Sequence, residues 1–224
     1  MTGKFIVIDG TDGSGKATQT ELLKARLAGA GLAVETVTFP QYDKKSAGLV
    51  EEYLGGKYGS ADEVDPKVAS LFYAVDRYDA SFMIRQWLAA GKTVVADRYT
   101  TANMGHQGAK FADPQQRAAF LSWLDDLEYN VLGIPRPDLT VILHMPASVA
   151  QQLAKQRVGR DWAGKARDVH EEDLDHLQAA EATYLEITQR LPHCTLVECA
   201  AGDTPLSREV VADKVWQIVA PLVQ

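Results

Sequence analysis

The sequence predicts an α/β fold, in which a parallel five-stranded sheet is covered by helices on both faces. Short apolar runs rich in β-branched residues alternate with longer segments whose apolar residues recur every three or four positions. Strands that are apolar throughout are typical of parallel sheets, because both of their faces are buried. With 224 residues and 46% hydrophobic content, the chain is expected to form a single domain over residues 1–224.

The predicted elements follow one another in regular order. The strands are expected at residues 5–8, 34–39, 93–96, 139–145 and 195–197. Helices are expected after Lys16, from Pro66, after Tyr99, from Asp113-Pro114, from about His170 to Arg190, and across Val211–Leu222. Two sets of apolar residues share a helix face and are expected in the core: Val68, Leu71, Phe72 and Val75, and then Phe120, Leu124, Leu127 and Val131.

Composition excludes several classes of protein. The net charge of -7 argues against a nucleic-acid surface, and no apolar run approaches the roughly 20 residues of a membrane span. The N-terminus runs directly into a strand without the pattern of a signal peptide, so a cytoplasmic enzyme is expected. Cys194 and Cys199 are too few for a disulfide framework and are interpreted as small apolar residues of a late strand.

A phosphate-binding loop is predicted at the end of the first strand. The segment Gly10-Thr11-Asp12-Gly13-Ser14-Gly15-Lys16-Ala17-Thr18 satisfies G-x-x-x-x-G-K and leads directly into a helix. Glycines let successive backbone N–H groups wrap a polyphosphate, and the helix N-terminus adds a favourable dipole. Lys16 can then bridge the β- and γ-phosphates of a bound nucleotide.

The loop departs from the usual pattern at one position. A Ser or Thr normally follows the lysine and holds Mg²⁺ through its hydroxyl, but here the residue is Ala17. The metal must then be held through water or by another residue. Thr18 lies one position further along and is a candidate only for an α-phosphate contact.

A second charged motif, Asp97-Arg98-Tyr99, follows the third strand. Ligands of parallel sheets bind at the carboxyl ends of the strands, so this motif is expected beside the phosphate loop. Arg98 can fork between two phosphates in a way that a lysine cannot, and Asp97 can orient the water shell of a metal ion or the acceptor. The alternative is a structural ion pair at a strand end.

With these motifs, the chain resembles the thymidylate kinase family of P-loop nucleoside monophosphate kinases over nearly its whole length. Further similar stretches are Phe39-Pro40, residues 71–77, Gln107-Gly108, Pro137-Asp138-Leu139 and a basic segment near Arg160. The resemblance implies a P-loop kinase fold with a small basic lid, and transfer of the γ-phosphoryl group of ATP to dTMP in dTTP synthesis, with Mg²⁺. It also implies a homodimer formed through helices, although no stripe in the sequence identifies the interface.

The base of the acceptor is expected on the helix that begins at Pro66. Tyr73 and Arg77 are four residues apart, so they share one face, on which a ring can stack on a base while a guanidinium donates to a carbonyl oxygen such as thymine O4. This spacing resembles the family's Phe-x-x-x-Arg, with Tyr73 in place of phenylalanine. The alternative is a core tyrosine and a surface arginine.

The sugar of the acceptor is expected on the next helix, where Asn103, His106 and Gln107 share a face. The resemblance implies that Asn103 reads a base edge and that Asp12 accepts from the 3′-hydroxyl of the sugar. It also places Phe39 in the acceptor site. Where this chain has His106, the family usually has Tyr or Phe against the deoxyribose, which puts sugar discrimination in doubt; a structural histidine is the alternative.

Two basic features remain. Family members usually carry an arginine after Phe-Pro to grip the acceptor phosphate, but Gln41 stands there and only Lys44 or Lys45 could supply charge, so weaker acceptor binding or a shifted acceptor is expected.

The basic lid is expected at about residues 157–169, with Arg160 as its catalytic arginine. The lid residues are Arg157, Arg160, Lys165 and Arg167. A solvated loop balanced by the acidic residues 171–173 is the alternative.

Two other functions stay open. The missing arginine and His106 leave room for a kinase that acts on another pyrimidine (deoxy)nucleotide or on a nucleoside. Ala17 leaves room for a non-catalytic nucleotide-binding protein that has lost its metal site.

Overall fold

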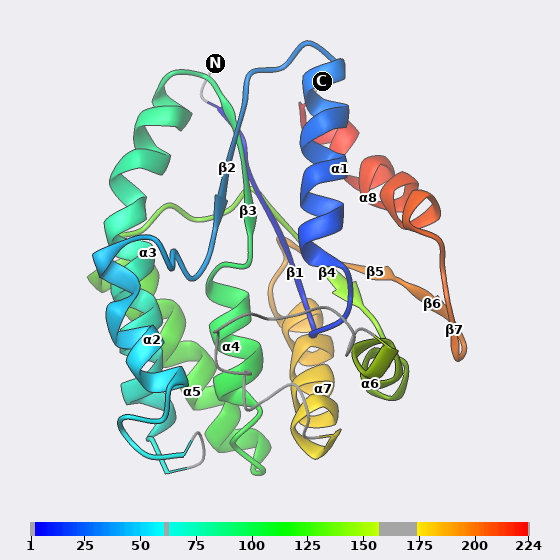
Figure 1. Cartoon of the computed structure of the whole chain (residues 1–224). Coiled ribbons are helices and arrows are strands. Elements are labelled where there is room, and N and C mark those ends of the chain that lie inside the picture. Colours follow the sequence, from blue (N-terminus) through cyan, green and yellow to red (C-terminus); the bar gives the residue numbers. More distant parts are fainter. Residues whose placement is uncertain (1–2, 61–62, 157–173, 224) are drawn as a thin grey trace.

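The computed structural model describes residues 3–60, 63–156 and 174–223. Five parallel strands form one sheet, as predicted, and the structure places them in the order β2-β3-β1-β4-β5 (Figure 1). The strands are β1 (Phe5–Gly10), β2 (Val34–Thr38), β3 (Thr93–Asp97), β4 (Leu139–His144) and β5 (Cys194–Glu198). Since β1 lies between β3 and β4, the loop that follows it emerges near the middle of the carboxyl edge.

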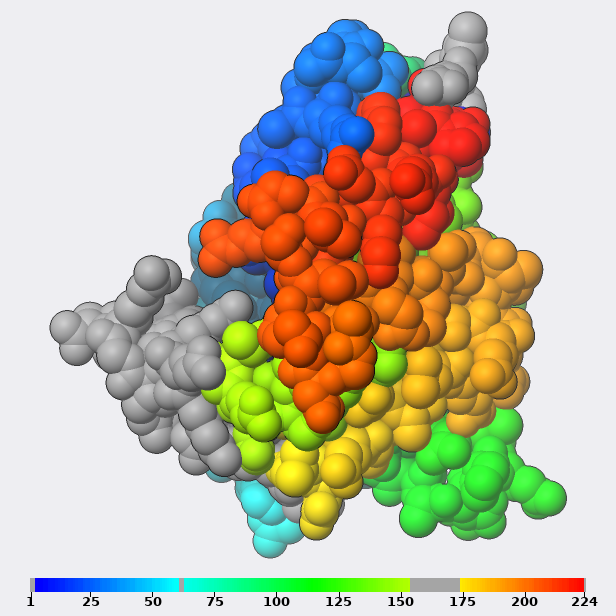
Figure 2. All heavy atoms as spheres, turned by 90° about the vertical axis from the view of Figure 1, so that its right-hand side faces the viewer, coloured from blue at the N-terminus to red at the C-terminus, as the bar shows by residue number. Residues whose placement is uncertain are grey.

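Helices cover both faces of this sheet. The helices are α1 (Lys16–Gly29), α2 (Gly48–Leu54), α3 (Pro66–Ala89), α4 (Thr100–Gly108), α5 (Pro114–Asp126), α6 (Ala147–Gln156), α7 (Leu174–Arg190) and α8 (Arg208–Val223). A 3₁₀ turn (Lys45–Ala47), a π-helical segment (Leu127–Val131) and a small hairpin of β6 (Ala200–Ala201) and β7 (Thr204–Pro205) complete the described chain. Figure 2, which is turned by 90° from Figure 1, shows α1 in blue and α8 in red lying against each other on one face of the molecule.

Alternate residues of β1 fill the core on the two sides of the sheet. Ile6 and Ile8 pack with α1 and α8, while Phe5 and Val7 pack with α3. All four side chains are completely buried. The uninterrupted apolar run therefore reflects a strand with helices above and below it, which confirms the fold predicted from the sequence.

The prediction of which face of α3 lies in the core is wrong. Val68, Leu71 and Val75 are exposed, and Phe72 is only partly buried against a satellite cluster. The helix instead buries Ile84 and a set of small or polar residues: Ala69, Ser70, Ala74, Asp76, Arg77, Ala80 and Ser81. Close packing against β3 and α4 favours small side chains. The two buried charges are compensated, Arg77 by an ion pair with Glu128 and Asp76 by hydrogen bonds from Gln41 and Ser46.

The apolar face predicted for the helix that begins at Pro114 is correct at its start and wrong at its end. Phe120 and Leu124 are buried as expected, but Val131 is 69% exposed. The helix becomes π-helical over Leu127–Val131, and the wider turn rotates the following residues away from the 3.6-residue period. Glu128 is turned inward by this segment and is completely buried.

Other expectations about the core are confirmed. Buried residues of α7 and α8 follow the predicted periodicity: Leu177, Ala180, Tyr184, Ile187, Val211, Val215 and Val219. Cys194 and Cys199 are buried and free, and burial raises the pKa of each thiol to about 12, so neither is a reactive thiolate. Across the described ranges, no helix is long and apolar enough to cross a membrane.

Candidate active site

The phosphate loop connects β1 to α1 and presents bare main chain. Gly13 and Gly15 have φ angles of 77° and 89°, which other residues adopt only at a cost. A Cβ on Gly13 would also lie 3.2 Å from the Cβ of Ala150 in α6. The Ser14 hydroxyl is buried and makes no hydrogen bond within the described residues. A loop of this kind, with an unused donor among its backbone N–H groups, fits the phosphates of a nucleotide.

Lys16 is folded back into the loop. Its Nζ donates to the carbonyl oxygens of Gly10 at 2.9 Å and Thr11 at 2.8 Å, and lies 3.4 Å from Oδ1 of Asp12. Burial, together with the positive charge of Arg98, lowers the pKa of the Lys16 ammonium. The ammonium is therefore held among neutral carbonyls and one shared carboxylate, and arriving phosphate oxygens would offer it stronger partners.

Arg98 is joined to the phosphate loop rather than to its neighbour Asp97. Its Nη2 donates to Oδ1 of Asp12 at 2.6 Å. Although burial acts in the opposite direction, the charges of Arg98 and Lys16 hold the pKa of the Asp12 carboxyl well below its usual range. Arg98 also has a φ of 66°, an uncommon conformation for a residue with a side chain, which is typical of functional sites. The alternative of a strand-end pair between Asp97 and Arg98 is thus not what the geometry favours.

Asp97 is the carboxylate that the sequence predicts beside a metal ion. It lies buried at the end of β3, where burial and the charge of Asp9 raise its pKa despite Lys16 and Arg98. The nearby Asp9 is already occupied, since it accepts from Thr101 Oγ1 at 2.5 Å and from the Tyr184 hydroxyl at 3.1 Å.

No group of three or more potential ligand side chains surrounds a metal position among the residues that the structure describes. Mg²⁺ usually combines one or two carboxylates with water and substrate phosphates, so one carboxylate beside the loop fits this ion. Ala17 has no hydroxyl to offer such an ion.

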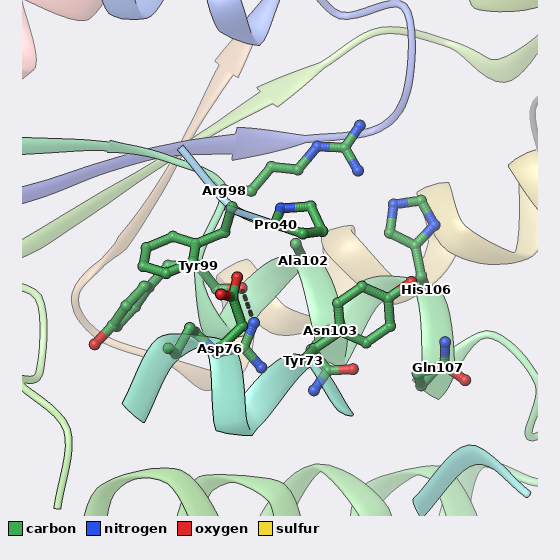
Figure 3. Close-up of a pocket in the computed structure, with 11 residues that line it drawn as sticks. Pro40, Tyr73, Asp76, Arg98, Tyr99, Ala102, Asn103, His106 and Gln107 are labelled. Carbon is green, nitrogen blue, oxygen red and sulfur yellow. Dashed lines mark hydrogen bonds between the residues drawn. The ribbon is translucent and has the colours of Figure 1, made fainter. Parts of the chain in front are cut away.

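A pocket opens beside Arg98 and collects most of the predicted acceptor residues (Figure 3). Its lining comes from the ends of β2 and β3, from α3 and from α4: Phe39, Pro40, Tyr73, Asp76, Arg77, Arg98, Tyr99, Ala102, Asn103, His106 and Gln107. Arg98 and His106 lie above the ring of Tyr73 in this view. Because Arg98 reaches both the loop and the pocket, two ligands bound there would meet at its guanidinium.

Arg77 is neither at the surface nor unpaired. Arg77 is 2% exposed and Glu128 is 0% exposed. Nε of Arg77 donates to both carboxylate oxygens of Glu128, at 3.1 and 2.9 Å, and Nη2 donates to Oε1. Although burial opposes it, the charge of Glu128 raises the pKa of Arg77. The alternative of a surface arginine is wrong. Sequence reasoning missed Glu128, because its partner lies 51 residues away.

The α4 residues present unused polar atoms. Nδ2 of Asn103 donates to the Ser70 carbonyl at 3.2 Å, which leaves its buried Oδ1 without a hydrogen bond in the described chain. Nε2 of His106 is likewise buried without a hydrogen bond, 4.0 Å from Oδ2 of Asp12. Burial, aided by the charge of Arg98 and opposed by that of Asp12, lowers the pKa of His106 to about 3. The imidazole is therefore neutral and can serve a sugar hydroxyl.

The position of the missing arginine is occupied by a buried amide. The carboxylate of Asp76 accepts from the Gln41 backbone at 2.9 Å, from Gln41 Nε2 at 3.2 Å and from Ser46 Oγ at 2.7 Å. Gln41 is thus committed to fixing the loop. Lys44 is exposed and pairs with Asp43 at 3.6 Å, away from the pocket. Among the described residues that line the pocket, the cations are Arg77, which is paired with Glu128, and Arg98.

The expected lid, with Arg157, Arg160, Lys165 and Arg167, lies outside the described residues. Its two flanking helices are described. His144 at the end of β4 contacts Glu181 of α7 through Nε2 at 2.8 Å and Glu198 through Nδ1 at 2.6 Å. Glu181 also accepts from the backbone N–H of Ala147 at the start of α6, at 2.9 Å. The helices on either side of residues 157–173 are therefore tied to the sheet.

A strand, phosphate loop and helix, joined through one arginine to a second pocket, define a P-loop kinase that acts on a small phosphorylated acceptor. Comparison with known proteins narrows the class. The family model described as thymidylate kinase matches residues 8–203. The chain belongs to the thymidylate kinase family.

Individual proteins that are similar to this chain are also thymidylate kinases. The chain is 33% identical over 184 residues to the thymidylate kinase of Mycobacterium tuberculosis, covering 82% of this chain and 85% of that protein. It is 35% identical over 216 residues to that of Caulobacter vibrioides, covering 96% and 97%. A solved thymidylate kinase structure from Candida albicans superposes with a TM-score of 0.75 at 24% identity, over 98% and 92% of the two chains, and shares the fold.

Proposed function

We propose that this protein transfers the γ-phosphoryl group of ATP to dTMP, giving dTDP and ADP. The family supports ATP as donor with Mg²⁺, and dTMP as acceptor. The observation that carries the proposal is the position of Arg98, which is bonded to Asp12 of the phosphate loop and also lines the adjoining pocket. Phosphoryl transfer needs two phosphates held in line with their charge neutralised, and this is the arrangement that one shared arginine can provide.

The chain's own residues would work as follows. The loop binds the donor phosphates, and Lys16 exchanges its carbonyl partners for phosphate oxygens. Arg98 exchanges Asp12 for the transferring group and the acceptor phosphate, which is itself the nucleophile and needs no general base. Asp97 would hold Mg²⁺, which when bound neutralises charge on the β- and γ-phosphates.

The acceptor would be recognised at three points. The ring of Tyr73 stacks on the base, and Arg77 donates to a base carbonyl. The unused Oδ1 of Asn103 accepts from the base N3–H. Asp12 and His106, whose facing atoms lie 4.0 Å apart, are close enough for one sugar hydroxyl to bond to both.

A coupled assay that follows ADP formation tests the proposal with dTMP, dUMP, dCMP and thymidine as acceptors. The expected order of kcat/KM places dTMP first and thymidine last, because thymidine brings no phosphate to Arg98. Turnover of another acceptor without dTMP would replace the proposed substrate. Tight ATP binding without turnover of any acceptor would support the non-catalytic alternative.

We further propose that two copies of the chain associate through α3. Five exposed apolar residues recur at spacings of three and four along this helix and are between 41% and 54% exposed: Val68, Leu71, Val75, Tyr78 and Phe82. This spacing is that of a coiled-coil seam, and a self-complementary stripe suits a two-fold dimer.

Sedimentation velocity tests the dimer. Leu71→Asp should give monomers, while Val210→Asp, at an equally exposed apolar position of α8, should leave the dimer intact. If the wild-type chain sediments as a monomer at micromolar concentration, the dimer proposal is wrong.

A further inference from the structure

Glu128 occupies a position that the reaction outlined above does not use. Its carboxylate is completely buried in the π-helical segment Leu127–Val131, beneath the acceptor pocket. A buried carboxylate is costly, and a well-packed apolar pair in place of a buried ion pair is often neutral or stabilising. π-Helical turns inside α-helices are frequent at functional sites. The burial and the local backbone therefore both indicate that the carboxylate serves the pocket.

The bonds of Arg77 show what Glu128 does to it. A guanidinium has five N–H groups. Nε and one N–H of Nη2 go to Glu128, and one N–H of Nη1 goes to the Tyr99 carbonyl at 3.4 Å. One N–H remains on each of the two terminal nitrogens, and the plane that contains them is fixed by Glu128. Arg77 lines the pocket, so these two N–H groups are the donors that it has left for a ligand there.

The same segment also supports the other wall of the pocket. The Tyr129 hydroxyl lies 2.6 Å from Oγ1 of Thr100, the first residue of α4. The Tyr99 hydroxyl donates to the Pro135 carbonyl at 3.0 Å. Residues 128–135 thus fix the positions of both α3 and α4 where they face the acceptor.

We propose that Glu128 is a positioning residue that sets base specificity through Arg77. By fixing the guanidinium plane, it makes the pocket accept a base that presents a carbonyl oxygen at this edge, as thymine and uracil do at position 4. Cytosine presents an amino group there, so its donor would meet the donors of Arg77. The inference rests on the proposed function, since it concerns the same acceptor pocket.

The test compares acceptors in variants of Glu128. Glu128→Gln keeps the shape but replaces one acceptor oxygen by an amide donor that faces Arg77. The ratio of kcat/KM for dTMP to that for dCMP should fall about tenfold or more, as expected when a charged hydrogen bond loses its orientation. The KM for ATP should stay unchanged. Where dCMP turnover is too slow to follow, its inhibition constant against dTMP replaces its kcat/KM.

Glu186→Gln is the matched control, because Glu186 pairs with Arg117 at 2.7 Å away from the pocket and should leave the ratio unchanged. The double variant Arg77→Met/Glu128→Gln carries no unpaired charge and is the safeguard if Glu128→Gln unfolds. Its dTMP/dCMP ratio should equal that of Arg77→Met, since Glu128 acts only through Arg77.

A purely structural Glu128 would lower kcat/KM for both acceptors by the same factor and leave the ratio as in wild type, which overturns the inference. A further loss of selectivity in the double variant relative to Arg77→Met would also contradict it. Failure of the proposed function is distinguishable, because it would appear as wild-type protein that does not phosphorylate dTMP at all.

Discussion

The donor and acceptor sides of the site are built in different ways. The proposed donor side is one continuous stretch, residues 10–18, in which main-chain geometry and the start of α1 would do most of the binding. The acceptor side collects side chains from the ends of β2 and β3, from α3 and from α4, and contacts a π-helical segment further along the chain. A polyphosphate can be bound by repeated backbone N–H groups, but recognition of one base requires particular side chains from several directions.

This difference has an energetic counterpart. The charges of the donor side are paired with exchangeable partners, since Lys16 bonds carbonyls and Arg98 shares Asp12 with it. On the acceptor side, Arg77 is committed to a buried carboxylate in a bidentate pair. We infer that Lys16 and Arg98 keep partners that phosphate oxygens can replace. Arg77, which is proposed to bind the base, keeps its partner and its orientation when the acceptor binds.

Arg98 belongs to both sides, and its removal should have the largest effect. Arg98→Ala is expected to lower kcat by about a thousandfold or more, as for arginines that stabilise transferring phosphoryl groups. The apparent melting temperature should change little, because Asp12 keeps Lys16 as a partner. Stopped assays with dTMP and ATP give the rate, and Arg26→Ala, which removes an exposed pair with Asp213 between α1 and α8, is the control. Near wild-type activity would remove Arg98 from the proposed role.

Replacement of Tyr73 should weaken binding of the acceptor without affecting binding of ATP. Tyr73→Ala is expected to raise the KM for dTMP about tenfold or more, because base–aromatic stacking contributes roughly 1–3 kcal/mol per base. The dissociation constant for ATP, measured by calorimetry, should be unchanged. Tyr58→Ala, at a tyrosine that bonds Glu52 outside the pocket, is the matched control. A parallel loss of ATP affinity would mean that the two sides are not separate.

His106 should give the acceptor side a distinctive pH dependence. Its folded-state pKa of about 3 lies below the usual value of 6.5, so the neutral ring contributes stability above pH 6.5 that is lost as the pH falls towards 3. At pH 5 the loss is expected to be about 2 kcal/mol relative to pH 8. Urea unfolding of wild type and His106→Phe at both pH values isolates this contribution. An equal pH dependence in the two proteins would show that His106 titrates normally.

His144 should make stability depend on pH in the opposite direction from His106, and by a smaller amount. Although burial opposes it, Glu181 and Glu198 raise the pKa of His144, so its ion pairs are fully present below pH 6.5 and are lost as the pH rises through the folded-state pKa. His144→Asn should therefore lower the melting temperature more at pH 6 than at pH 9. A deficit that is the same at both pH values would show that packing, rather than charge, is what the variant loses.

The two sides also differ in how far sequence alone predicts them. The loop at residues 10–18 and the buried strands were predictable, because both depend on neighbours in the chain. The exposed stripe of α3 was placed in the core because periodicity reveals an apolar face without telling which partner covers it. Glu128 was missed because no local pattern signals a buried pair with Arg77.

The pocket residues were predicted individually, but the geometry that joins them was not. Tyr73, Arg77, Asn103 and His106 come together because β3 ends beside β1 and α4 packs on α3. That Gln41 is buried against Asp76 rather than facing a phosphate depends on the fold of the loop after β2. Such contacts are tertiary and have no counterpart in residue spacing.

One structure determination tests the central claim, that Arg98 joins two nucleotide sites, most directly. A crystal of the protein with a ligand in which adenosine and thymidine are joined by five phosphates should place the adenosine-side phosphates on residues 10–18. The thymine should lie against Tyr73 with an oxygen at Arg77, and Arg98 should contact the phosphates between them. Thymine bound away from the pocket, or Arg98 still paired only with Asp12, would contradict the account.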